Sequence, residues 1–291
     1  MDLKKLLTSK QISFKNYNGL FFVSAANQQQ GTNIAFQILL QLLDRKTVMY
    51  LSGGKTPKDL YEQLAQNFSQ ANSEVITPGA VAMIDERFAE KLHANSNELM
   101  IKQTKLLRNL ELHGVNFYPI LQNRHSEFIS ESSQGKQILK KFQDDELNES
   151  AERYDQTIRG LFAHYPKSVG ILGIGNDGHT AGVPAAGNLE LRTKNPSRLG
   201  SRSEADLEQF STEMVMSYDD TSGKYGKRIT MTFLGLSMLD VFIVLVFGED
   251  KKKALQAMFA EGTEEEIPAR FYLRPEIAQK TILITDQEIN N

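Results

Sequence analysis

The chain has 291 residues, of which 40% are hydrophobic and 24% charged, as in ordinary globular proteins, and we expect one α/β domain over residues 1–291. The 33 basic and 36 acidic residues leave a net charge of −3, which excludes a strongly basic surface for nucleic acid or an anionic membrane. The absence of cysteine excludes disulfides, thiolate catalysis and cysteine-ligated zinc, and it fits a reducing cytoplasm, where we expect the protein to act.

Apolar runs of strand length alternate with segments of helical periodicity along the chain. Strands are expected at 21–23, 47–51, 80–84, 116–120, 168–174, 241–247 and 280–285. Helices are expected at 33–43, from Pro57 through Leu64, at 97–107, at 151–165 and at 248–258. This alternation predicts a mostly parallel sheet with helices on both faces.

Two long polar stretches interrupt the alternation. Residues 122–150 are rich in Ser, Glu, Gln and Lys, and we expect a polar surface insertion there. Residues 182–227 are expected to be largely irregular, and a long connection of this kind beside a site often carries substrate contacts.

Glycines, an aspartate and a histidine follow the strand at 168–174. In open α/β sheets ligands bind at the carboxyl ends of the strands, which is where His179 is delivered. An imidazole has an ordinary pKa of about 6.5 and acts as a general base near neutral pH. Asp177 is expected to orient the imidazole or to contact the substrate, and the N–H groups near Gly175 or Gly54 are candidate donors to a developing oxyanion.

The loop after the strand at 47–51 suits an anion, because its glycines allow close backbone approach and a helix begins just beyond it. The candidate phosphate-binding residues are Ser52, Gly53, Gly54, Lys55 and Thr56. A tight turn from strand to helix without a ligand is the alternative interpretation.

Charged residues stand at the ends of three further apolar runs. Arg87 can bind a phosphate with two parallel hydrogen bonds, and Asp85 can orient a base or hold a sugar hydroxyl; a structural ion pair is the alternative. Arg228 and Lys251 can each supply a second cation, although Lys251 also suits a solvated helix start. No metal-ligand spacing and no dinucleotide-binding motif occurs, so we expect no metal and no cofactor.

Taken in order, these segments resemble the 6-phosphogluconolactonase family. The resemblance covers nearly the whole chain apart from 122–150 and part of 190–220, and it depends on the ordered set of motifs. The matching stretches are 51–57, 85–87 with Ser96 and Asn97, 173–181, 227–232, 248–255 and 267–269.

The resemblance implies a Rossmann-like α/β fold shared with glucosamine-6-phosphate deaminases and ribose-5-phosphate isomerases. It implies hydrolysis of 6-phosphogluconolactone to 6-phosphogluconate in the pentose phosphate pathway, with His179 as base and with Ser52–Thr56 and Arg87 at the sugar phosphate. Asn97 lies in a matched stretch and is expected at the substrate. The expected partner is a small phosphorylated sugar lactone, with no nucleic acid and no membrane, and the expected assembly is a monomer or a small homo-oligomer.

Two alternatives remain open from the sequence. Glucosamine-6-phosphate deaminases usually carry an Asn-Glu-Pro segment after the Asp-Gly-His motif, whereas this chain has Val183, Pro184 and Ala185 there. A non-catalytic sugar-phosphate sensor usually carries a helix-turn-helix ahead of the fold, and the roughly twenty residues before the first expected strand are too few for one.

Overall fold

The computed structural model describes residues 2–69, 75–89, 92–122, 133–184, 212–220 and 226–289. Their centre is an eight-stranded sheet in which only the edge strand β1 runs antiparallel to its neighbour. The strands lie in the order β1 (Lys15–Tyr17), β2 (Leu20–Ser24), β11 (Thr281–Thr285), β10 (Val241–Val246), β7 (Lys167–Gly173), β3 (Thr47–Leu51), β4 (Ala80–Met83) and β6 (Asn116–Tyr118).

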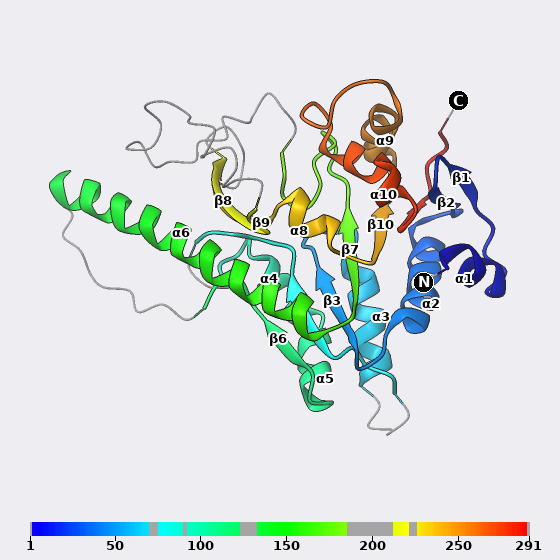
Figure 1. Ribbon diagram of the computed structural model, residues 1–291, viewed down its shortest axis with the longest axis horizontal. Helices are drawn as coiled ribbons and strands as arrows, with labels where there is room; N and C mark the ends of the chain where they lie inside the picture. The colour runs from blue at the N-terminus through cyan, green and yellow to red at the C-terminus, as the bar shows by residue number, and fades with distance from the viewer. Residues whose placement is uncertain are drawn as a thin grey trace.

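Helices surround this sheet, as Figure 1 shows, and confirm the predicted α/β architecture. The central strands β3 and β10 are buried at every position, which explains why their sequences are continuous apolar runs instead of alternating ones. The helices are α1 (Leu3–Ser9), α2 (Gln28–Leu42), α3 (Lys58–Phe68), α4 (Asn97–Gln103), α5 (Leu106–Leu112), α6 (Ser133–His164), α8 (Phe233–Ser237), α9 (Lys252–Phe259) and α10 (Pro275–Ala278), with 3-10 turns at Glu249–Lys251 and Pro268–Leu273.

The direction of strand addition reverses between β3 and β7. From β3 the chain adds β4 and then β6 on one side, and it returns to place β7 and then β10 and β11 on the other side. Such a reversal leaves a crevice at the carboxyl ends of the two strands that flank it, where ligands of open α/β sheets bind. The loops after β3 and β7 are the two glycine-containing motifs that the sequence singles out.

A second sheet of three antiparallel strands, which we call the small sheet, was not predicted. It consists of β5 (Asp85–Arg87), β9 (Gly226–Met231) and β8 (Val215–Asp220), in that order. Asp85–Arg87 is therefore a strand, although its residue types have low strand propensity; pairing with β9 overrides that local preference. The expectation of an irregular chain over 182–227 is wrong for β8, and residues 185–211 and 221–225 lie outside the described residues.

The predicted helices have shifted ends in the structure, for example 28–42 for the expected 33–43, and two of them differ most. The segment 97–107 forms two helices, α4 and α5, because Lys105 adopts a left-handed conformation with φ of 66°. The helix expected at 151–165 begins already at Ser133, and its first half projects beyond the main sheet (Figure 1). Of the expected insertion, 123–132 lies outside the described residues, so its character as an insertion stays a prediction. None of the described helices combines the length and apolarity needed to cross a membrane.

Candidate active site

His179 and Asp177 form a hydrogen-bonded pair in the loop after β7. The imidazole Nδ1 lies 2.5 Å from Asp177 Oδ1, and the backbone N–H of His179 donates to the same oxygen at 3.2 Å. The loop is closed by hydrogen bonds from the N–H of Gly175 to His179 O at 2.8 Å and from the N–H of Gly178 to Gly175 O at 3.0 Å. These contacts within the motif hold the imidazole against a carboxylate.

Gly175 is required by the close approach of the histidine ring. A Cβ at this position would lie 2.1 Å from both Cε1 and Nδ1 of His179, which is well inside van der Waals contact. The N–H of Gly175 donates to His179 O and so stabilises the loop. A direct contact of Gly175 with the substrate stays a prediction.

The pairing has an electrostatic consequence for both residues. The hydrogen bond from His179 lowers the pKa of Asp177 to about 2, so the carboxylate is ionised at neutral pH. A carboxylate that accepts from Nδ1–H selects the tautomer in which Nε2 carries the lone pair. The His179 side chain is 42% exposed, which lets Nε2 take a proton from a water molecule or a bound ligand.

Lys251 lies in the 3-10 turn Glu249–Lys251 that follows β10, and the charge of Asp177 acts on it. Burial lowers the pKa of this half-buried ammonium, while Asp250 and Asp177 oppose the shift. Anion binding by Lys251 stays a prediction.

Replacing Asp177 with Asn is expected to weaken the pH dependence of stability in acid. The folded-state pKa of about 2 lies below the ordinary 3.8, so ionised Asp177 contributes stability that is present above about pH 4 and is lost as the pH falls toward 2. The side chain is 52% exposed, and solvent screening keeps the contribution below about 1 kcal/mol. Urea unfolding of wild type and Asp177→Asn between about pH 5 and pH 2.5 measures it. Parallel pH profiles of the two proteins would contradict the expectation.

Contacts from distant elements anchor the histidine loop. Thr180 Oγ1 donates to Gly173 O at 2.9 Å and lies 2.6 Å from the hydroxyl of Tyr272, and the N–H of Ala269 donates to Gly178 O at 3.0 Å. Side chains of the small sheet also bind the backbone of this loop. The hydroxyls of Thr230 in β9 and Tyr218 in β8 donate to the carbonyls of the two residues after Thr180, Ala181 and Gly182.

Asn97 connects the small sheet to the loop after β3. Its Nδ2 donates to the backbone O of Asp85 at 2.9 Å and to Oδ2 at 3.1 Å, and its Oδ1 accepts from Arg87 Nη1 at 2.5 Å. Gly53 packs directly on this amide, since a Cβ there would lie 1.9 Å from Asn97 Oδ1. Asp85 in turn lies against Gly182, where a Cβ would be 3.0 Å from Oδ2. The three motif loops therefore meet in one continuous set of contacts.

Glu86 is the residue that fixes the start of helix α4. Its carboxylate accepts the N–H groups of Arg87, Asn97 and Glu98 and the hydroxyl of Ser96, all at 2.8 Å. Burial raises its pKa, and these four donors oppose the shift by stabilising the charged form. Because it binds both Arg87 and Asn97, Glu86 orients two predicted site residues without reaching the crevice itself.

Arg87 and Arg228 are cross-strand partners in the small sheet. Side chains that face each other on antiparallel strands project from the same face with Cβ atoms about 4.5–5.5 Å apart, and like charges so placed repel. Arg87 Nη1 also donates to Asn95 O at 2.6 Å, and Arg228 is only 7% exposed. Two guanidinium groups on one face of the small sheet suit a doubly charged anion such as phosphate, and binding of a substrate phosphate by this pair stays a prediction.

The loop after β3 supplies polar groups beside Asn97. Ser52 is 5% exposed, and its hydroxyl has no hydrogen-bond partner among the described residues. The hydroxyl of the buried Tyr61 in α3 stabilises the loop by donating to Ser52 O at 2.8 Å. Thr56 is half-buried, whereas Gly54 and Lys55 are exposed, and contacts of these three with a substrate stay predictions.

The sequence did not point to Tyr218, Thr230, Tyr61 or Glu86 as supports of the site. Ser96, which also binds Glu86, is different, because a serine before a helix is a recognisable cap in sequence. In the structure its hydroxyl accepts the N–H of Leu99 at 3.1 Å. Within the described ranges no three His, Asp or Glu side chains cluster as metal ligands.

Fold and site together define a Rossmann-like α/β protein with a histidine–aspartate pair and an arginine pair at the strand-order reversal. The family described as glucosamine-6-phosphate isomerases/6-phosphogluconolactonase matches residues 26–282, and the chain belongs to this family.

Similar proteins carry one of the two activities in that description. The chain is 26% identical over 270 residues to the 6-phosphogluconolactonase of Chlamydia pneumoniae, covering 91% of this chain and 82% of that protein. It is 26% identical over 229 residues to the 6-phosphogluconolactonase of Nostoc sp., covering 76% and 75%. The solved 6-phosphogluconolactonase structures from Plasmodium vivax (TM-score 0.66, 19% identity, 100% and 97% covered) and Trypanosoma cruzi (0.60, 21%, 94% and 95%) share its fold.

Proposed function

We propose that this protein hydrolyses 6-phosphogluconolactone to 6-phosphogluconate, the lactonase step of the pentose phosphate pathway. The observation that carries the proposal is the His179–Asp177 pair, held in one set of contacts with the Arg87–Arg228 pair at the strand-order reversal. One pair supplies a base and the other binds a phosphate, which are the two groups that a phosphorylated lactone needs. The names of the curated relatives support the same reaction.

In the proposed reaction His179 acts on water. Its Nε2 takes a proton as the water oxygen attacks the lactone C1, and it returns that proton to the ring oxygen as the C1–O bond breaks. The products are a carboxylic acid, which ionises, and a free sugar hydroxyl. Asp177 keeps Nδ1 protonated and stabilises the imidazolium that forms between the two steps. The ester is intrinsically reactive, so one general base suffices as the catalytic group.

Phosphate binding positions the reacting carbon. Arg87 and Arg228 bind the phosphate, with Lys251 as a further cation and the Ser52 hydroxyl as a donor. Asp85 and Asn97 keep Arg87 in place by their shared hydrogen bonds. Anchoring at the phosphate turns attack at C1 into a reaction between groups that are already oriented. We place this reaction in the cytoplasm, which a chain without cysteine suits.

The experiment that tests the function is lactone hydrolysis with the spontaneous rate subtracted. Purified protein is added to freshly made 6-phosphoglucono-δ-lactone, and 6-phosphogluconate is measured with a coupled dehydrogenase. We expect hydrolysis well above the uncatalysed rate, and no ammonia from glucosamine-6-phosphate. Ammonia release without lactone hydrolysis would replace the proposal with the deaminase. Tight binding of 6-phosphogluconate without turnover would replace it with a sensor.

A further inference from the structure

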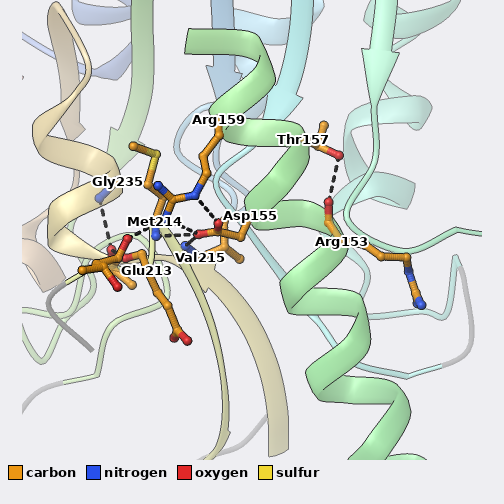
Figure 2. A network of polar contacts seen from close by, with 10 residues as sticks. Arg153, Asp155, Thr157, Arg159, Glu213, Met214, Val215 and Gly235 are labelled. Atoms are coloured by element: carbon orange, nitrogen blue, oxygen red, sulfur yellow. Dashed lines mark hydrogen bonds and ion pairs between the residues drawn. The ribbon is translucent and has the colours of Figure 1, made fainter. Parts of the chain in front are cut away.

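Asp155 of α6 binds Val215, the first residue of strand β8, and Met214, the residue before it. Its Oδ1 accepts the N–H groups of Met214 at 2.6 Å and Val215 at 3.0 Å, while Oδ2 accepts Arg159 Nε at 2.5 Å. Figure 2 shows the carboxylate between Arg159 on its own helix and the strand. Arg159 Nη2 donates further to Thr212 O at 2.5 Å. Asp155 and Arg159 together therefore bind two backbone N–H groups and one backbone carbonyl of residues 212–215.

The same segment is fixed from its other side by α8. Thr232, the cap of α8, donates from Oγ1 to Glu213 O at 2.7 Å and accepts the N–H of Gly235 at 3.1 Å. The N–H of Thr232 also donates to Met214 O at 2.9 Å. The start of β8 and the three residues before it are therefore held between α6 and α8 by hydrogen bonds to the backbone of residues 212–215.

Two further polar contacts join α6 to the small sheet. Asn148 Oδ1 accepts the hydroxyl of Ser217 in β8 at 2.7 Å, and Asp144 Oδ1 lies 2.6 Å from Lys227 Nζ in β9. Asp144, Asn148 and Asp155 are spaced by four and seven residues, which places them on one stripe of the helix. This stripe faces strands β8 and β9, and β9 carries Arg228.

Tyr154, the neighbour of Asp155, binds the end of β4, just before the chain continues into β5 with Arg87. Its fully buried hydroxyl donates to Met83 O at 2.6 Å and accepts the N–H of Met83 at 2.7 Å. Met83 is the last residue of β4, and the neighbouring β6 pairs with β4 only as far as Ala82. The hydroxyl thus takes the place of a strand partner where the chain leaves the main sheet to form β5.

We propose that Asp155 and Tyr154 are positioning residues for phosphate recognition: together they set the position of the strands that carry Arg228 and Arg87. The inference rests on the proposed function. Neither residue is placed in the crevice; Asp155 acts on Arg228 through the pairing of β8 with β9, and Tyr154 acts on Arg87 through Met83. Because the two arginines oppose each other across β5 and β9, a shift of either strand changes the affinity for an anion that both side chains bind.

The test compares Asp155→Asn and Tyr154→Phe with a control on the same helix. Phe162→Leu is the control, because Phe162 stacks on Tyr50 of the main sheet at a centroid distance of 5.5 Å and its side chain has no group that can hydrogen-bond to the small sheet. We expect the calorimetric Kd of 6-phosphogluconate and the KM of the lactone to rise about tenfold in both test variants, which is less than the roughly 10²-fold that a misplacement of about 1 Å can cost. In the same variants kcat is expected to change less than about threefold.

Hydrolysis of glucono-δ-lactone, which lacks the phosphate, separates positioning from general loss of structure. Asp155→Asn and Tyr154→Phe should leave this slow reaction unchanged, whereas the control should lower the Tm without changing either Kd or KM. A Kd equal to that of wild type in both test variants, with only the Tm lowered, would overturn the inference. If Asp155→Asn does not fold, Tyr154→Phe alone decides, because it deletes one oxygen atom. Wild type that binds 6-phosphogluconate without hydrolysing the lactone would refute the proposed function but leave the Kd comparison valid.

Discussion

Replacing His179 with Ala is expected to lower kcat for lactone hydrolysis by about 10²–10⁴, the usual contribution of a general base. The hydrogen bond to Asp177 orients the ring so that only Nε2 can take the proton, and no other histidine is placed in this loop. The KM is expected to change little, because the proposed phosphate site lies on the other strands β5 and β9. Initial rates on fresh lactone, corrected for spontaneous opening, measure both constants.

His164→Gln is the matched control for this prediction. His164 is exposed at the end of α6, directly before β7, and therefore lies at the opposite end of that strand from His179. Its replacement should leave kcat unchanged. A loss of less than about tenfold in His179→Ala, with the control at the wild-type rate, would remove His179 from the role of base.

The second large effect is expected from the arginine pair. Each charge-assisted hydrogen bond contributes about 1.5–3 kcal/mol, so Arg87→Ala or Arg228→Ala should raise KM by about 10–100-fold. The kcat should fall much less, since the phosphate is bound equally in the ground state and the transition state. The loss in the double variant should be smaller than the sum of the single losses, because both guanidinium groups bind one anion.

Arg153→Ala serves as the control for the loss of an arginine. Arg153 lies on the exposed side of α6, where it pairs with Glu149 at 3.3 Å, and its removal should leave KM at the wild-type value. Competition by inorganic phosphate gives an independent measurement, since the inhibition constant of phosphate should rise in step with KM in Arg87→Ala and Arg228→Ala. An unchanged KM in both Arg87→Ala and Arg228→Ala would mean that the phosphate binds elsewhere.

The sequence by itself determined seven of the eight strands of the main sheet, all except β1, and the chemistry of the loops. Continuous apolar runs such as 47–51 and 241–246 became strands at nearly the predicted bounds, because a strand buried on both faces must be apolar throughout. The His179–Asp177 pair was also predictable, since both residues lie in one tight loop and their contact depends on three residues of local geometry. The family resemblance followed from the order of these loops.

Only the tertiary structure decided which charged residues share the crevice and what holds them there. The pairing of Arg87 with Arg228 joins strands that are far apart in the chain, and the low strand propensity of Asp85–Arg87 gave no sign of it. Glu86 carries the same charge as Asp85, yet it binds the start of α4, because burial leaves it facing four donors. The roles of Tyr154 and Asp155 depend on where α6 crosses the small sheet. Helical periodicity shows which residues share a face, but only packing shows what that face contacts.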